Sequence, residues 1–423
     1  MADFPGLQNC YGCRAMDVRL SEEQELLRQS AREFLARECP MSRVRSAIDD
    51  PRGASDTLWN QMAELGWPGL VIPECYGGAG LGAVELAVLF EETGRVLLPG
   101  SLFAHVALGG VAIDLAGSPE QKQRMLPALA EGSARVTFAQ LEEGSSWGPE
   151  GIRLEARSEG DGYRLVGTKV HVPDAHLADW LVVPARCVDG DAAGAVVLCL
   201  VAASAPGVTI RPFAFVDETR KMCQVELHDV AIPPEDVLRS SEAEGSGDAG
   251  SELLERILDV ARVALSAELC GASLRVLDMS VEYAKTREQF GRKIGSFQAI
   301  AHKCADMFVR AESARSATYY AAWAVANHEP DAHTSACLAK AYCCDAASHI
   351  AGEGIQIHGG LGFAWEQDPQ LYFRRAKASE HFLGDPSWNR ELAARVLLDD
   401  APAREAGSLA ASAAGAARPA TSS

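Results

Sequence analysis

The feature that most constrains the fold of this chain is a change of hydrophobic period, from helical to strand-like and back. Apolar residues recur on one helical face from 26 to 35, behind a capping-box pattern at 21–24. Between about 136 and 237 the pattern becomes short β-branched stretches such as YRLVGTKVHV and AVVLCLVA, separated by Gly, Pro and Asp. From 254 to 279 apolar residues return with a period close to 3.6. The order of the chain is therefore helical, β, helical.

These two changes of period set the expected domain boundaries. We expect an N-terminal helical domain over 17–132, a middle β domain over 133–240 and a C-terminal helical bundle over 251–400. Residues 1–16 and the low-complexity tail 401–423 are expected to be loose. The 423 residues are enough for two or three domains and a large core. The sequence has no internal repeat and no Gly-rich nucleotide-binding fingerprint.

Composition narrows the class of protein. A net charge of -19 without a strongly basic face argues against nucleic-acid binding, although one pocket can still be locally basic. The longest apolar run, 193–203, is too short for a membrane span, and the N-terminus lacks a secretory signal pattern, so we expect a cytoplasmic protein. The twelve cysteines are scattered and expected to be reduced. The Cys10-x-x-Cys13 pair has no second pair at ligand spacing, so no metal site is expected.

Residues 283–307, YAKTREQFGRKIGSFQAIAHKCADM, form the most informative stretch. A long helix is expected to end at a glycine, a basic turn to follow, and a new helix to open at Ser296; taken alone, this predicts a helix hairpin with a solvated turn. The whole string resembles the signature of the acyl-CoA dehydrogenase family. Two further stretches, LGWPGLVIPECYGGAGLG (65–82) and EGIQIHGGLGF (353–363), are similar to other signatures of that family. The resemblance covers about residues 17 to 400.

The resemblance implies a fold, a cofactor and a set of contacts. The fold is an α+β multidomain arrangement: an N-terminal α-helical domain, a β-barrel-like middle domain and a C-terminal four-helix bundle. The cofactor is FAD, and a guanidinium suits its pyrophosphate while an aromatic ring can pack beside its adenine. Glycines would allow the backbone to approach the cofactor closely. The residues implied to contact the ADP half of a neighbouring subunit's FAD are Arg287, Phe290, Gln298, Gln356, Gly359 and Gly360.

The positions that the family uses for chemistry are changed. Members of the family remove the α-proton of an acyl-CoA with a carboxylate, at one of two positions, while a hydride passes to the flavin. Those two positions hold Leu383 and Ala261 here. Leu141 and Trp147 stand where the family has a threonine and a serine near the flavin. The family's Trp-x-Thr is residues 171–173, and Pro173 lacks a backbone donor for the flavin ring. The stretch HFLGDP is thus interpreted as an active-site loop without its base.

This pattern favours a subunit that gives FAD contacts to a homologous partner subunit, which carries the base. The assembly would be a heterotetramer or a heterodimer, acting with an acyl-CoA substrate and an electron-transfer acceptor. The stretches VPDAHLAD and GGLGFAWEQDPQLYFRRA are similar to the bacterial branch acting on steroid side-chain CoA thioesters. One alternative is a self-sufficient homo-oligomeric flavoenzyme, including an oxidase or monooxygenase, with Asp385, Glu380 or Glu255 as a displaced base. Another is a flavin-free scaffold protein.

Overall fold

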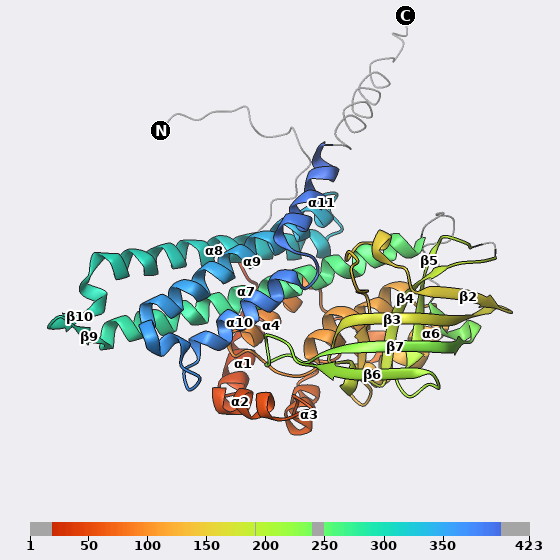
Figure 1. Cartoon of the computed structure of the whole chain (residues 1–423), viewed down its shortest axis with the longest axis horizontal. Helices are drawn as coiled ribbons and strands as arrows, with labels where there is room; N and C mark the ends of the chain where they lie inside the picture. Colours follow the sequence, from red (N-terminus) through yellow and green to blue (C-terminus); the bar gives the residue numbers. More distant parts are fainter. Residues whose placement is uncertain (1–18, 191, 239–248, 399–423) are drawn as a thin grey trace, which may run out of the picture.

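The structure is a computed structural model that describes residues 19–190, 192–238 and 249–398. Within these residues the expected helical–β–helical order is confirmed. The two expected loose ends, 1–16 and 401–423, lie outside the described residues, as does most of the segment between the expected middle and C-terminal domains. Figure 1 shows the long C-terminal helices extending to one side and the sheet lying on the other.

The N-terminal part is a cluster of helices with clear start signals. Ser21 Oγ accepts from the Gln24 backbone N–H at 3.2 Å, and the Gln24 side chain accepts from the Ser21 N–H, which confirms the predicted capping box. Ser118 and Gln121 form a second capping box. The helices are α1 (Glu22–Glu38), α2 (Met41–Asp49), α3 (Asp56–Glu64), α4 (Ala83–Arg95), α5 (Val111–Ala116) and α6 (Pro119–Ala130), with a π-helical turn at Ala104–Gly110.

Helix α4 fixes the N-terminal helices onto the first C-terminal helix, α7 (Ala249–Thr286). Their contact needs two glycines: a Cβ at Gly94 would lie 1.9 Å from the Glu268 carbonyl oxygen, and one at Gly271 would lie 1.7 Å from that of Glu91. The two backbones therefore pack directly against each other, and their buried side chains belong to one continuous core.

The middle part is an eight-stranded sheet in the order β6-β7-β3-β2-β4-β5-β8, with β1 pairing parallel to β4. Neighbouring strands are mostly antiparallel, and their inward side chains form a second core, which includes Leu165, Val183 and Val225. The strands are β1 (Val136–Phe138), β2 (Glu155–Glu159), β3 (Gly162–Pro173), β4 (Trp180–Cys187), β5 (Val196–Ala202), β6 (Val208–Phe213), β7 (Met222–Ile232) and β8 (Val237–Leu238).

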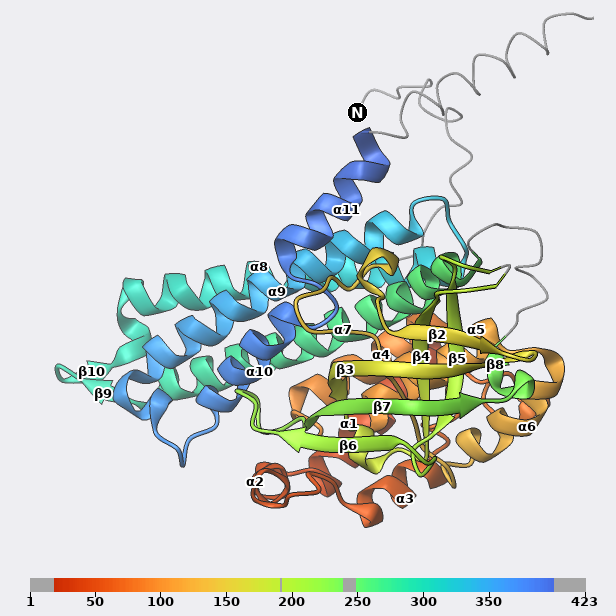
Figure 2. The same ribbon diagram turned by 45° about the vertical axis from the view of Figure 1, so that its right-hand side comes forward.

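The C-terminal part is a bundle of long helices. Helix α7 runs beside α8 (Gln298–Ala326) and α9 (Ala332–His358), and both views show the three extending together away from the sheet (Figures 1 and 2). Helix α10 (Pro369–His381) packs against α9 and α7, and α11 (Pro386–Leu398) against α9. Across the described ranges, no helix combines the length and the apolar character that crossing a membrane requires.

The turn between α7 and α8 differs from the sequence prediction. Helix α7 ends at Thr286 rather than at a glycine, and α8 begins at Gln298 rather than at Ser296. The reason is the pair Phe290-Gly291, with φ of 52° and 76°, since two residues of positive φ make the tight turn that suits a two-residue hairpin. The expected simple turn is therefore a small hairpin made of β9 (Glu288–Gln289) and β10 (Arg292–Lys293).

Candidate functional site

A groove of about 570 Å³ lies at the end of the bundle where the β9–β10 hairpin is found. It brings together Arg287 and Phe290 from the hairpin region with Gly359 and Gly360 from the turn after α9, four of the six residues predicted to contact the ADP half of FAD. The lining residues are Tyr283, Arg287, Gln289, Phe290, Ile294, Phe297, Ile300, Ile357, His358, Gly359, Gly360 and Leu361.

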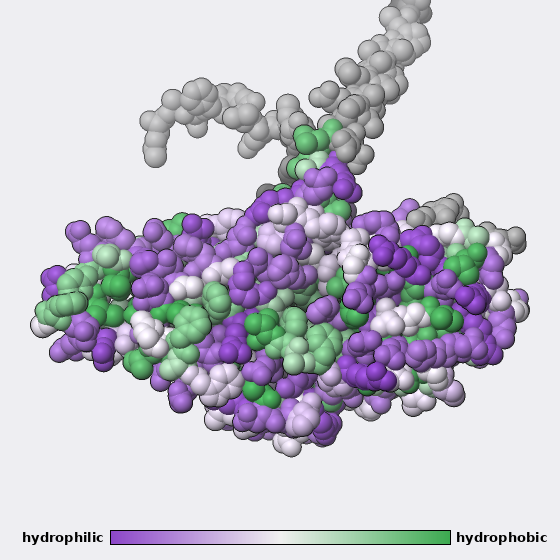
Figure 3. Space-filling model, viewed as in Figure 1, coloured by the Kyte–Doolittle hydropathy of each residue, from purple (hydrophilic) through white to green (hydrophobic). Residues whose placement is uncertain are grey.

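The hairpin presents an aromatic ring to solvent on one side of the groove. Phe290 is 92% exposed because it occupies the tip of the tight turn. Its ring meets that of Phe297 edge to face, with centroids 6.2 Å apart. Hydrophobic residues also gather at this end of the surface, where β9 and β10 lie (Figure 3). So large an apolar side chain held in water suits a surface that a ring system or another subunit covers.

The opposite wall of the groove is formed by the backbone of two glycines. A Cβ built on Gly359 or Gly360 would meet no atom within 4 Å, so glycine at both positions leaves space rather than avoiding a clash in this chain. Gly359 has φ 63° and ψ -142°, a conformation that essentially only glycine adopts. Gln356, in the last turn of α9, and Gln298, the first residue of α8, are exposed beside the groove but not among its lining residues.

Two lining residues were missed by the sequence reasoning. The rings of Tyr283 and His358 stack with centroids 4.4 Å apart and an interplanar angle of 25°. Nδ1 of His358 lies 2.7 Å from the Gly354 carbonyl oxygen, which fixes the plane of the imidazole. The stack joins the ends of α7 and α9 into one flat wall. The sequence offered one signal for this wall, the aromatic residue at position 283 that opens the stretch 283–307.

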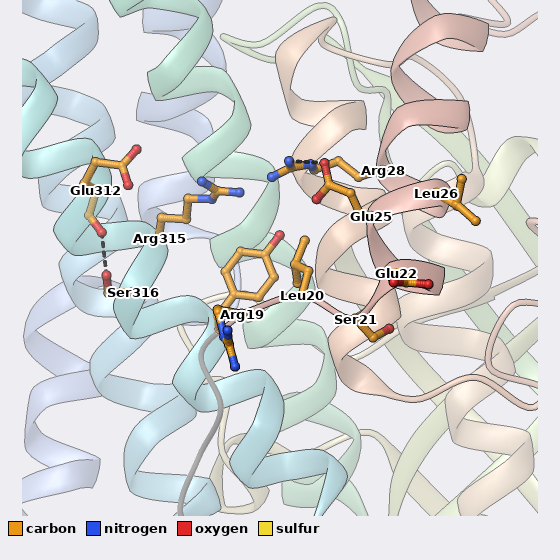
Figure 4. A pocket seen from close by; sticks show the side chains of 11 residues that line it. Arg19, Leu20, Ser21, Glu22, Glu25, Leu26, Arg28, Glu312, Arg315 and Ser316 are labelled. Atoms are coloured by element: carbon orange, nitrogen blue, oxygen red, sulfur yellow. Dashed lines mark hydrogen bonds and ion pairs between the residues drawn. The ribbon is translucent and has the colours of Figure 1, made fainter.

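Charge distinguishes this groove from a larger cavity of about 880 Å³, between residues 19–28 and α8 (Figure 4). In that cavity three arginines are matched by three glutamates. Arg28 pairs with Glu25, and Arg315 pairs with Glu91 at 3.0 Å. The residues that line the groove include Arg287 but no Asp or Glu. A guanidinium, exposed rings and bare backbone together fit a pyrophosphate joined to a purine.

The predicted base position is closed. Leu383 is fully buried between α10 and α11, with φ 62°, a left-handed conformation that costs a non-glycine residue about 1–2 kcal/mol. A Cβ on Gly384 would lie 2.1 Å from the Trp388 ring, so glycine is required there. The Asn389 side chain donates to the carbonyl oxygens of Leu383, Gly384 and Asp385, at 3.2, 3.0 and 3.0 Å. The loop is thus held in place by packing and hydrogen bonds.

Aromatic side chains fill the space next to Leu383. The Trp147 and Phe382 rings meet edge to face with centroids 5.2 Å apart, and the centroid of the Phe103 ring lies 5.8 Å from that of Phe382. The guanidinium of Arg220 lies 4.7 Å from the centre of the Phe103 ring. Trp147 occupies the position where the family is expected to have a serine, so the substitution replaces a small polar group with a buried indole.

A buried ion network holds these rings. Arg220 Nη2 donates to Glu268 Oε2 at 2.5 Å, and Arg375 donates to Glu268 and to Asp217. Burial opposes the ionisation of Glu268, but Arg220 and Arg375 outweigh it and lower the pKa of this carboxyl group. Breaking such a buried pair on one side is strongly destabilising. The network therefore positions Arg220 against the rings.

The strand that the family would place along the flavin ring is distorted. Lys169 pairs with Val225 and Val172 with Cys223, so β3 has one extra residue, a β-bulge, at 170–171. His171 has φ 52°, and its ring packs 5.2 Å from that of Phe213. Thr137 Oγ1 donates to the Pro173 carbonyl oxygen at 2.7 Å. Residues 171–173 thus make packing contacts and a hydrogen bond within the chain.

Each acid considered as a displaced base already has a structural partner. Asp385 Oδ1 accepts from the Trp388 backbone N–H at 2.8 Å and so caps α11. Glu380 accepts from Ser348 Oγ at 3.0 Å and pairs with Lys377. Glu255 lies 3.4 Å from a nitrogen of Arg262. Ala261, the second family base position, is fully buried in α7.

Comparisons with known proteins agree with the fold described above. Residues 21–133 match the family model of the acyl-CoA dehydrogenase N-terminal domain, and 248–398 that of the C-terminal domain. The acyl-CoA dehydrogenase IpdE2 of Mycobacterium tuberculosis is 33% identical over 86% of this chain and 94% of its own. Among solved structures, the ChsE4-ChsE5 complex from the same organism is 26% identical with a TM-score of 0.81, covering 90% and 99%. A Tcur3481-Tcur3483 steroid ACAD variant is 30% identical with a TM-score of 0.80, also covering 90% and 99%.

Proposed function

Because the chain belongs to the acyl-CoA dehydrogenase family, whose members are FAD-dependent, we propose that it is one subunit of a heteromeric enzyme of this family. In this proposal the chain contributes Arg287, Phe290, Gln298, Gln356, Gly359 and Gly360 to the ADP half of an FAD. A homologous partner subunit holds the flavin ring of that FAD and carries the catalytic carboxylate.

The observation that carries the proposal is the distance along α7. Ala261, a family base position, and Thr286, the residue before Arg287, lie on the same 38-residue helix. At 1.5 Å per residue they are about 38 Å apart, which exceeds the length of an extended FAD. One FAD cannot reach both the groove and the chain's own base position. The groove therefore suits a cofactor whose ring lies in another subunit.

The residues at the chain's own flavin and base positions support a role in which the chain contributes only to the ADP end of an FAD. Trp147, Phe382 and Leu383 pack where the flavin ring and the base would meet, and Pro173 offers no N–H to a ring atom. When bound, FAD accepts a hydride from the acyl-CoA. The residues of this chain would hold the far end of the cofactor: Arg287 would donate to the pyrophosphate, and Phe290 would pack beside the adenine.

The names of similar proteins support a proposal for the substrate class and the electron acceptor. One similar structure is named as a steroid ACAD and two are named as pairs of proteins, so we extend to this chain a bulky, steroid-type acyl-CoA and a paired assembly. Another similar structure, 28% identical with a TM-score of 0.81, is described as an electron transferring flavoprotein. A protein of that type is the electron acceptor we propose, with the complex working in the cytoplasm.

Co-expression tests the proposal. The chain would be produced alone, and also with a homologous subunit that has glutamate at the position matching Leu383. We expect no flavin in the chain alone, and in the complex one FAD per pair of chains with turnover of acyl-CoA. Visible absorbance and a protein-to-FAD ratio measure this. A yellow homo-oligomer that turns over acyl-CoA alone would contradict the heteromer, and a colourless complex would favour the scaffold alternative.

A further inference from the structure

A second groove lies toward the opposite end of the helical bundle from the groove described above. It has a volume of about 810 Å³ and is bordered by α8, α9 and α11. Ile300 lines the first groove and Tyr320 lines this one, and α8 rises about 30 Å between them, so the two are separate sites. We call it the bundle groove. Its lining includes Ala317 and Tyr320 of α8, Leu338 and Tyr342 of α9, and Arg390 and Leu397 of α11.

Large apolar side chains gather in the bundle groove and remain exposed there. Tyr320 and Tyr342 are each 39% exposed, Leu338 is 45% exposed and Leu397 is 54% exposed. These residues belong to three different helices, so the fold alone brings them together. A contiguous apolar patch of this kind on a folded chain indicates a surface that another protein surface covers.

The charged groups that line the bundle groove are already paired within the chain. Asp331 accepts hydrogen bonds from Tyr320 Oη at 2.7 Å and from Ser335 Oγ at 3.1 Å. Arg390 forms an ion pair with Asp345. Among the described residues, the lining therefore has one acid and one base, and their charges cancel. Such a groove is poorly suited to the phosphates of a nucleotide or of an acyl-CoA, and it suits the apolar core of a protein interface.

Helix α11 gives the same face a projecting apolar element. Its first two turns pack against α9, where Asn389 and Ala393 are buried, and both views show its end standing away from the bundle (Figures 1 and 2). At that end Leu397 lines the groove, and the next residue, Leu398, is 72% exposed. A face that carries both an apolar groove and a projecting apolar helix end can pair with itself about a two-fold axis.

We propose that the bundle groove is an interface between two copies of this chain, in which the α11 end of each copy lies over the α8–α9 face of the other. The net charge favours this occupant. Two copies of a chain with a formal charge of -19 repel each other, and a contact face whose lining charges cancel keeps that repulsion small. In the complex proposed above the interface would join two pairs into a two-plus-two tetramer, and this step alone rests on the proposed function.

The chain produced alone tests the interface without reference to the cofactor. Sedimentation equilibrium at micromolar concentrations should give twice the monomer mass. Leu338→Glu places a carboxylate from each copy in the contact and should weaken the dimer about a hundredfold or more. Val188→Glu is the control, since Val188 follows β4 and is 46% exposed, and it should leave the dimer unchanged. Circular dichroism checks that both variants fold, and Leu397→Glu provides a second disruption of the groove. A monomeric wild type, or wild-type dimer affinity in the folded Leu338→Glu variant, overturns the inference.

Two further measurements distinguish the other possible occupants. A chain that ends at Leu398 should dimerise as the full chain does. If only the shortened chain dimerises, the segment 399–423 occupies the groove and the inference is overturned. In the complex with a homologous subunit, Leu338→Glu should give one-plus-one particles with unchanged FAD content. If the variant instead loses the homologous subunit, that subunit covers the groove and the inference is again overturned. A colourless two-plus-two complex would contradict the proposed function and still support the interface.

Discussion

The indole of Trp147 meets the ring of Phe382 edge to face, 5.2 Å between centroids, and this contact joins the segment before β2 to the loop between α10 and α11. Phe382 immediately precedes Leu383, so the indole packs beside the position where the family resemblance predicts the base. The contact is a packing interaction of the core.

Removal of the indole should therefore weaken the fold without affecting the partner's cofactor. We expect Trp147→Ala to lower the free energy of unfolding by about 3–5 kcal/mol, because a buried aromatic side chain is lost and a cavity remains. Trp365→Ala is the control, since Trp365 is 45% exposed, and it should cost far less. Denaturant unfolding measures both. Loss of FAD from the complex with Trp147→Ala, at unchanged stability, would show that this pocket holds cofactor.

Asp174 gives a prediction that depends on pH. This residue is buried, has φ 49°, and neither carboxylate oxygen has a hydrogen-bond partner. Burial raises its pKa from 3.8 to about 6, against the attraction of Arg220 and Arg375. The folded protein then binds this proton more tightly than the unfolded chain. Stability is therefore lost as the pH rises from about 4 to about 6, and the loss persists at pH 7.

Asp174→Asn should remove that loss, because asparagine keeps the shape and also tolerates a positive φ. We expect the variant to be more stable than the wild type by on the order of 3 kcal/mol at pH 7, and equal to it below pH 4. Asp229→Asn is the matched control, since Asp229 has φ 54° but is exposed. Unfolding curves at pH 7 and below pH 4 measure the difference in stability between each variant and the wild type. A variant no more stable than the wild type at pH 7 would mean that the carboxylate is well solvated or paired.

The sequence predicted the larger elements because their hydrophobic periods are long. The capping box at 21–24, the helical periodicity at 26–35 and 254–279, and the strand region follow from local patterns, and the family signatures led to four residues that line one groove. The hairpin at 288–293 was not predicted, because strands of two residues have no measurable period. The π-helical turn at Ala104–Gly110 was missed because its composition does not differ from that of an α-helix.

The parts of the sites that were missed depend on tertiary contacts. Tyr283 and His358 stack only because α7 and α9 end at the same level of the bundle. Tyr320 and Leu338 line the bundle groove only because α8 and α9 pack against each other, so no local spacing indicated that they would meet. A pattern search finds ligands that are close in sequence, whereas these pairs result from the packing of two long helices.

Arg287 provides the direct test of the groove. If its guanidinium binds the FAD pyrophosphate, Arg287→Ala removes a charge-assisted hydrogen bond worth roughly 1.5–3 kcal/mol, about one to two decades of FAD affinity. Lys285→Ala removes the same charge two residues away, from a side chain that pairs with Glu282 and does not line the groove, and should have little effect. Titration of the apo complex with FAD measures both. Equal FAD affinity in the two variants would place the pyrophosphate elsewhere.

Asp385 separates the heteromer from a self-sufficient enzyme with a displaced base. It stands two residues after the buried Leu383, and its carboxylate caps α11 through the Trp388 N–H. Asparagine is about as good a cap as aspartate, so Asp385→Asn should change stability by only a few tenths of a kcal/mol. Because an amide cannot act as the base, turnover distinguishes the two functions. We expect the complex carrying Asp385→Asn to keep wild-type turnover and FAD content, since the base belongs to the partner subunit. If turnover disappears while FAD content stays full, the base lies in this chain, and the heteromer proposal assigns it to the wrong subunit.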